Sequence, residues 1–535
     1  MRILLFCVLA FSTAFSTSSC KKESKDKGSN SEPSTASSSA GASRPIAKSD
    51  VVLATVQLPT GAKIEGLANA IDNIQPGASA AMLPTVPMVL AQTLGMDLSG
   101  ANLDAPISVL VVDPKKHSKP LAMLVTPSDA SKLEAAAKAA GLVYVAKKKL
   151  ALIADAAVAE SVQDIAFASL ATPPSEFLVR IYPDVVLAAF KDDLHGAFQN
   201  MSQLMSQQQN GASSAVQAMM LAYEEMILAI GDQTQVMEMR VGTADGASDF
   251  NFRMQPKAGT TMAALAQAQV PSTHALLRKL PKSTSGSFLF SGDLRAGSAR
   301  QPLMDFSLKI MSVVMPSDGD EVMTKMLATW FESFDGQVAV NMNMDIANPQ
   351  TPKFDATYLM GASDAEMMRT GWREMMRHMA SRSKDGPAEM MGMKFDIKFE
   401  EKALEVDGVE VDRYETKLNL TDMNQEQRAM MAAAQVDQRM HVATFDDVAV
   451  MSLSSNSETL VKSAIEAARG KAPGYEPTGA IAAALARSTS LKESLVFTVD
   501  VGALAPSGVP IPFKLVTMGF GQERGALTMR MSIRK

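Results

Sequence analysis

The chain has 535 residues, of which 47% are hydrophobic and 20% are charged, and its formal net charge is −6. This length allows a sizeable core and more than one domain, and a mean hydropathy near zero argues against a disordered or polytopic chain. The excess of acidic over basic residues, with no Lys/Arg cluster after residue 50, argues against nucleic acid as a partner, because phosphate binding needs clustered positive charge.

Only two cysteines occur, Cys7 and Cys20, and both lie in the first twenty residues. The remainder of the chain therefore holds no internal disulfide, no thiol nucleophile and no cysteine-ligated zinc site. Without disulfides, the chain depends on burial for its stability, which its length permits.

The N-terminus has the features of a signal peptide. Arg2 is followed by the apolar stretch 3–15, which has the length of a signal-peptide core and is too short to span a bilayer. Small residues at 17–19 then precede Cys20, with Thr17 where most such motifs have leucine. This arrangement resembles the lipobox of bacterial lipoproteins. The resemblance implies a signal peptide over 1–19 and a diacylglycerol and palmitate anchor on Cys20; the alternative is an ordinary signal peptide with an incidental cysteine.

Residues 20–49 are expected to form a lipidated cysteine followed by a disordered tether rich in Ser and Lys. The segment has almost no large apolar side chain and therefore cannot offset its ordering entropy by burial. As a random coil it spans roughly 30 Å. Lys21 follows the cysteine in place of the aspartate that marks inner-membrane retention in well-studied lipoproteins, which favours the outer membrane. We therefore expect a cell-envelope protein and not a cytoplasmic one.

Strict alternation of apolar and polar residues predicts strands in several places, among them 338–345, 394–400 and 526–534. Apolar stripes at helical spacing predict helices between them, at 184–207, 213–230, 320–334, 363–380 and 456–469. Strands with one polar face are typical of antiparallel sheets covered on one side. The predicted fold class is α+β, with antiparallel sheets that have one face covered by helices.

The order of these elements repeats along the chain. A strand, helices, a hairpin and a helix are expected over 176–268 and again over 286–380, and 150–162 resembles 448–461. We therefore expect two similar α+β lobes, 50–285 and 286–535, although chance similarity of such elements is an alternative. The opening strand 51–59 and the Leu94–Leu98 step resemble exported bacterial proteins of unknown function, a group that implies no catalytic residue.

Motifs for catalysis are missing from the sequence. The five histidines are far apart, with no HExxH, and neither G-x-S-x-G nor a phosphate-binding glycine loop occurs. We therefore predict no catalytic residue, no cofactor and no enzymatic activity, and an enzyme without a local signature remains the alternative.

Methionine is unusually frequent, with 38 residues. Thioethers suit Cu(I), so Met375, His378, Met379, Met390 and Met393 form a weak copper candidate. Spacing on one helical stripe favours the other interpretation, in which these methionines fill the core. Oxidant scavenging is a further alternative.

These observations favour a non-enzymatic envelope lipoprotein that acts as a scaffold or interaction module. If a sheet face is left open, the same protein is expected to bind an apolar ligand, either a lipid or a hydrophobic segment of an envelope protein. The expected partners are the membrane, through the N-terminal lipid, and such a ligand or protein.

Overall fold

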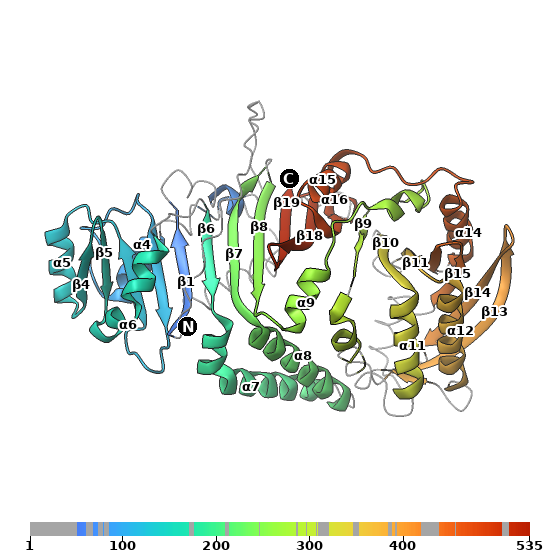
Figure 1. The fold of residues 1–535 in the computed structure, drawn as a ribbon, viewed down its shortest axis with the longest axis horizontal. Coiled ribbons are helices and arrows are strands. Elements are labelled where there is room, and N and C mark those ends of the chain that lie inside the picture. Colours follow the sequence, from blue (N-terminus) through green and yellow to red (C-terminus); the bar gives the residue numbers. More distant parts are fainter. Residues whose placement is uncertain are drawn as a thin grey trace. The chain divides into compact units, whose positions relative to one another are not determined.

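The computed structural model describes residues 51–59, 68–72, 77, 79, 85–170, 176–208, 213–244, 247–284, 287–295, 297–305, 308, 320–345, 353–382, 388–390, 393–418, 438–454, 456–504 and 513–534. The fold is α+β with antiparallel strand pairing, as predicted (Figure 1). The described residues form two compact units, one from Met1–Ala189, Val236–Phe252 and Ser532–Lys535, the other from Phe190–Gln235 and Arg253–Met531. Residues 190–235 and 253–285, which we expected in the first lobe, thus belong to the second unit, and residues from 532 onward, which we expected in the second lobe, belong to the first.

The sheet of the first unit has the strand order β4-β5-β3-β2-β1-β6-β7, and every neighbouring pair is antiparallel. The bounds of these strands are β1 (Val52–Leu58), β2 (Ile107–Val112), β3 (Leu121–Val125), β4 (Val143–Lys147), β5 (Leu150–Ala154), β6 (Phe177–Ile181) and β7 (Thr234–Ala244).

The core of the first unit lies on both faces of this sheet. Every residue of β2 and β3 is buried, which goes further than the predicted coverage of one face. Three helices, α4 (Thr85–Leu94), α5 (Ala130–Ala139) and α6 (Ala156–Ser169), follow β1, β3 and β5. Helix α6 begins where Asp155 accepts a hydrogen bond from the amide of Ala157, and its apolar stripe packs on the sheet.

The sheet of the second unit contains the order β15-β16-β11-β10-β9-β17-β18, again with antiparallel pairs throughout. Its strands are β9 (Phe288–Asp293), β10 (Phe334–Asp345), β11 (Lys353–Ala362), β15 (Gln438–Phe445), β16 (Val448–Ser454), β17 (Glu493–Asp500) and β18 (Leu515–Glu523).

The two strand orders are the same when β1, β2, β3, β4, β5, β6 and β7 are matched in turn with β9, β10, β11, β15, β16, β17 and β18. The helices follow this correspondence, since α6 packs on β3 and β5, and α14 (Ser457–Ala468) packs on β11 and β16. The resemblance of 150–162 to 448–461 is therefore that of β5 and α6 to β16 and α14. The expected repeat of 176–268 in 286–380 would instead match β6 with β9, so it differs from this correspondence, and the two similar lobes over 50–285 and 286–535 stay a prediction.

Two connections differ between the halves. Residues 182–233 join β6 to β7 through α7 (Pro183–Gln208) and α8 (Ser213–Gln233), whereas residues 501–514 join β17 to β18 with the short α16 (Val501–Leu504). Conversely, only α5 separates β3 from β4. The matching connection in the second unit contains α12 (Ala365–Arg382), β12 (Ala388–Met390), β13 (Met393–Val406) and β14 (Val409–Leu418). Neither insertion is needed to complete the seven-stranded order, so each is an addition to a shared framework.

Helices cover both faces of the second sheet at β16. Val450 packs with Ile465 of α14 on one face, and Ala449 packs with Met368 of α12 on the other. The remaining elements are β8 (Ala247–Pro256), α9 (Thr261–Ala268), the 3-10 helices η1 (Ala275–Lys279) and η2 (Gly297–Ala299), α11 (Asp320–Ser333), α15 (Gly479–Ser490) and β19 (Ala526–Arg534). Among the described residues, no helix has the length and apolar character needed to cross a membrane.

Candidate functional site

A polar contact joins the two helices of the α7–α8 insertion, with the exposed His195 on one side and the buried Glu224 on the other. His195 Nδ1 of α7 lies 2.6 Å from Glu224 Oε1 of α8, and Gln199 Nε2 lies 2.7 Å from His195 Nε2. With the proton on Nδ1, the imidazole donates to Glu224 and accepts from Gln199. Glu224 is only 5% exposed, and its second oxygen is buried with no hydrogen-bond partner. Helices α7 and α8 lie side by side (Figure 1).

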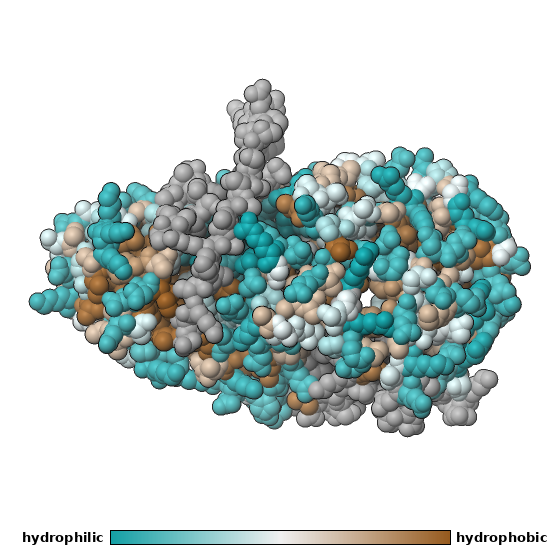
Figure 2. Space-filling view, in the orientation of Figure 1, coloured by the Kyte–Doolittle hydropathy of each residue, from teal (hydrophilic) through white to brown (hydrophobic). Residues whose placement is uncertain are grey.

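Apolar side chains lie on the outside of α8. Tyr223 is 48% exposed and Ile227 is 41% exposed, and they are followed by Ile230, which is half-buried. Positions i, i+4 and i+7 lie on one side of an α-helix, so these residues form a single row, which we call the α8 seam. Figure 2 shows apolar atoms among hydrophilic ones at the lower edge of the view, where Figure 1 draws α7 and α8.

An ordinary surface helix buries its apolar side. Helix α8 instead leaves these apolar side chains exposed, and its charged residues are divided, with Glu224 buried and Glu225 and Asp232 exposed. Of the seven large apolar side chains that are exposed among the described residues, four lie on α7 and α8, namely Met201, Leu221, Tyr223 and Ile227. Exposed apolar residues gathered on one element mark an interaction site more often than residues scattered singly. The sequence prediction had missed this seam and placed the apolar surface on the sheets.

The same insertion is strongly acidic. Between 183 and 233 the only basic residue is Lys191, and the acidic residues are Asp184, Asp192, Asp193, Glu224, Glu225 and Asp232. The surface therefore combines an apolar row with a negative field, and such a field favours positively charged partners.

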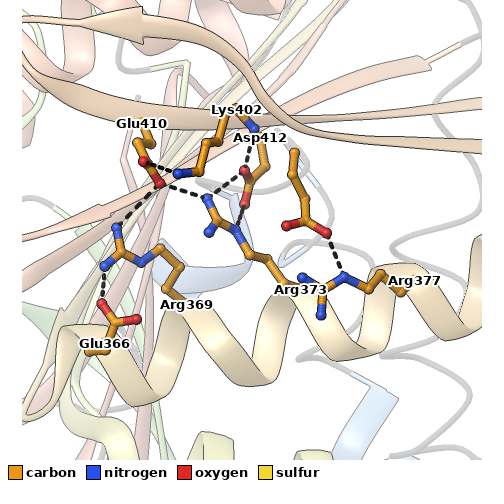
Figure 3. A network of polar contacts seen from close by, with 8 residues as sticks. Glu366, Arg369, Arg373, Arg377, Lys402, Glu410 and Asp412 are labelled. Atoms are coloured by element: carbon orange, nitrogen blue, oxygen red, sulfur yellow. Dashed lines mark hydrogen bonds and ion pairs between the residues drawn. The ribbon is translucent and has the colours of Figure 1, made fainter.

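Within the second insertion, a ladder of ion pairs joins α12 to the β13–β14 hairpin (Figure 3). Arg373 makes two hydrogen bonds to Asp412 of β14, at 2.7 and 2.8 Å, and a third to Glu410 at 3.2 Å. The Asp412 side chain is 5% exposed and also accepts a hydrogen bond from the backbone amide of Lys402 at 2.9 Å. These contacts attach the β13–β14 hairpin to the helix.

Further contacts extend the ladder in both directions. Arg377 lies 2.5 Å from Glu401, Arg369 contacts Glu366, and the Lys402 ammonium lies 2.5 Å from Glu410. Hydrogen bonds from Lys402 and then from Arg373 lower the pKa of Glu410, and the hydrogen bonds that Arg373 donates to Asp412 raise the pKa of Arg373. Each of these groups already has an oppositely charged partner, so the ladder is structural in character.

The five residues of the copper candidate lie in two places, on helix α12 and at the β12–β13 turn. Met375 and Met379 pack against Met376 and Tyr414 in a hydrophobic cluster of α12, which is the packing that the core interpretation expects. His378 Nε2 is buried without a hydrogen-bond partner. Met390 and Met393 pair with each other at the β12–β13 turn. Among the described residues, no group of His, Cys, Asp or Glu is arranged to hold a metal ion, and copper binding stays a prediction.

The predicted lipidation site, Cys20, lies outside the described residues.

A small pocket of about 250 Å³ in the first unit brings together Asp113, Lys116, His117 and Ser161. Ser, His and Asp are the residue types that form the catalytic triad of many hydrolases. However, Ser161 Oγ donates to the carbonyl of Val158, and Asp113 accepts from the amide of Lys115 and lies 3.7 Å from the Lys116 ammonium. Within the described part of the chain no hydrogen bond joins His117 to Ser161, so the arrangement lacks the nucleophile–base contact that such catalysis uses.

Comparison of the chain with protein-family models, with curated proteins and with solved structures gave no match in any of the three.

Proposed function

We propose that this chain is a non-enzymatic lipoprotein of the cell envelope that serves as an interaction module and binds an apolar ligand through α7–α8. The observation that carries the proposal is the orientation of α8, in which Glu224 is buried at 5% exposure while Tyr223 and Ile227 are 48% and 41% exposed. Four of the seven exposed large apolar side chains among the described residues lie on this insertion, whereas helices cover both sheet faces at β16.

Anchoring forms the other half of the proposal. Acylation of Cys20 contributes ~0.8 kcal/mol per buried methylene, which is sufficient for stable attachment when more than one chain is present. Residues 21–49 then serve as a tether that holds the body away from the headgroups, and Lys21 favours the outer membrane. The anchor keeps the α8 seam near ligands of the envelope.

Removing the anchor is expected to change the location of the protein completely. The Cys20→Ala variant should lose incorporation of labelled palmitate and should leave the membrane fraction for the aqueous fraction, whereas the wild type stays with membranes. Cell fractionation with immunoblotting measures this. A Cys20→Ala variant that still sediments with membranes would contradict the proposed anchor.

Apolar binding is tested with a helix-forming peptide of Leu and Gln, which carries an apolar row and no charge. Its affinity for the mature chain (residues 20–535) with Cys20→Ala is measured by fluorescence anisotropy, without detergent. Adding Tyr223→Ser and Ile227→Ser should weaken binding by about 30-fold, since each half-exposed side chain contributes about 1 kcal/mol when buried.

The matched control is Leu491→Ser, because Leu491 is 46% exposed at the end of α15 and lies outside the seam. This variant should bind the peptide as tightly as the parent chain does. Equal losses in the control and in the seam variant would show that binding is nonspecific, and the proposal would then fail.

A further inference from the structure

Positive charge is concentrated in one stretch of the first unit. Residues 113–149 contain eight lysines and three carboxylates, whereas the other residues from 50 onward comprise 36 basic and 51 acidic ones. All eight lysines are exposed, namely Lys115, Lys116, Lys119, Lys132, Lys138, Lys147, Lys148 and Lys149. The expectation that no basic cluster follows residue 50 is therefore wrong for this stretch, which is basic within an acidic body.

One group of these lysines lies where β4 ends. β4 is the last strand in the order of the first sheet and pairs with β5 (Figure 1). The turn between them carries the run of lysines 147–149, and Lys148 has a positive φ of 57°. Helix α5, which carries Lys132 and Lys138, packs on β4. Positive charge thus accompanies the edge strand of the sheet.

A second group lies where β4 begins. The Lys119 ammonium of the β2–β3 hairpin donates a hydrogen bond to the carbonyl of Ala140 at 2.7 Å, and Ala140 lies between Lys138 and the start of β4. Five strand residues span about 15 Å. The eight lysines therefore follow the length of β4, and we call them the lysine strip. Such a strip suits an extended anionic surface, whereas a small anion would engage only one end of it.

The strip lies near the point where the chain enters the first unit. The structure describes the chain from Val51, and Val51 lines the same pocket as Lys116 and His117 of the hairpin. The next residue, Val52, pairs with Val112 at the foot of that hairpin. The tether proposed for residues 21–49 therefore joins the body beside the hairpin end of the strip, which keeps these lysines close to the membrane that holds the anchor.

On this basis we propose that the lysine strip contacts the anionic phospholipid headgroups of the membrane to which Cys20 is anchored. The proposal rests on the anchor in the proposed function, because it adds a second contact with the same membrane. Lysines near an anionic bilayer are attracted to it, and the attraction falls off within a Debye length. Nucleic acid is the other extended anionic surface, and the expected export of the chain favours the membrane.

Sedimentation with vesicles of phosphatidylglycerol and phosphatidylcholine tests the proposal. The mature chain carries Cys20→Ala, so that acylation does not contribute. Adding Lys138→Gln, Lys148→Gln and Lys149→Gln should weaken binding at least about tenfold, since each lysine near the surface contributes to the attraction. Lys147 is left unchanged, because its ammonium lies over the Phe167 ring at 5.2 Å. Added salt should weaken binding of the parent chain.

Two control variants separate charge from structure. Arginine at positions 138, 148 and 149 retains the charge and should bind as tightly as the parent chain. Lys282→Gln, Lys398→Gln and Lys417→Gln together remove the same charge from exposed positions of the second unit and should also leave binding unchanged. Equal losses in the two glutamine variants, or a loss in the arginine variant, would overturn the proposal.

Failure of this proposal is distinguishable from failure of the proposed function. Palmitate incorporation at Cys20 tests the anchor and the Leu/Gln peptide tests the α8 seam, and neither measurement depends on the lysine strip. Equal binding of the parent chain and the strip variant to the vesicles would overturn the membrane contact alone. Tighter binding of the parent chain to duplex DNA than to the vesicles would identify nucleic acid as the ligand and would overturn it as well.

Discussion

Replacing Arg373 by methionine is expected to lower the free energy of unfolding of the second unit by about 3–5 kcal/mol. The side chain of Asp412 is 5% exposed and receives two of its hydrogen bonds from Arg373. Without the guanidinium, this carboxylate stays buried with only the amide of Lys402 beside it, and an unpaired buried charge is among the most destabilising changes in a protein.

Urea denaturation followed by tryptophan fluorescence measures this loss selectively. Trp330 and Trp372 are the only tryptophans of the chain, and both belong to the second unit. The control is Arg377→Met, because the Arg377 side chain is 55% exposed and exposed ion pairs contribute at most about 1 kcal/mol. If the two variants lose the same small amount of stability, the ladder does not hold the hairpin as described.

Acidification is expected to destabilise the second unit through His274. Burial lowers the pKa of His274 from its ordinary value of 6.5 to about 4, with hydrogen-bond contact to Ser291 only partly opposing the shift. The neutral ring is held between Ser291 and Ser488, at 3.2 and 3.4 Å. Because the folded pKa lies below the unfolded one, the stabilisation is complete above pH 6.5 and is lost as the pH falls toward 4.

Between about pH 7.5 and about pH 5 the expected loss from His274 is about 2 kcal/mol. His441 also has a lowered pKa, caused mainly by burial, and contributes in the same direction. The His274→Asn variant isolates the first effect, since Asn tolerates the positive φ of 54° at this position. Its unfolding free energy should vary less with pH than that of the wild type, and an unchanged pH dependence would contradict this account.

Local patterns in the sequence were sufficient to predict most elements. The alternation at 338–345 predicts a strand, which is β10, and the apolar stripe at 363–380 predicts a helix, which is α12. The dipeptide Asp407-Gly408 is of a type that favours a two-residue hairpin turn, and it joins β13 to β14. Both turn residues have positive φ, 52° and 78°, as a two-residue hairpin turn requires. These features depend on neighbours in sequence, which is why the sequence reveals them.

Contacts between distant segments were not predictable in the same way. Arg369 and Arg373 stand one turn apart in the sequence, but nothing local indicates that Glu410 and Asp412 face them, since that depends on how β14 pairs with β15. The α8 seam was missed for a related reason. Residues 215–230 are apolar around most of the helix, which is a usable signal, but which side is buried depends on the contact between His195 and Glu224.

The most direct test of the central claim, that the α8 seam is the binding surface, is hydrogen–deuterium exchange of the mature chain with and without the uncharged Leu/Gln peptide. The account predicts slower amide exchange over residues 221–233 when the peptide is bound, and unchanged exchange in β2 and β3. Slower exchange confined to segments outside α7 and α8 would contradict it.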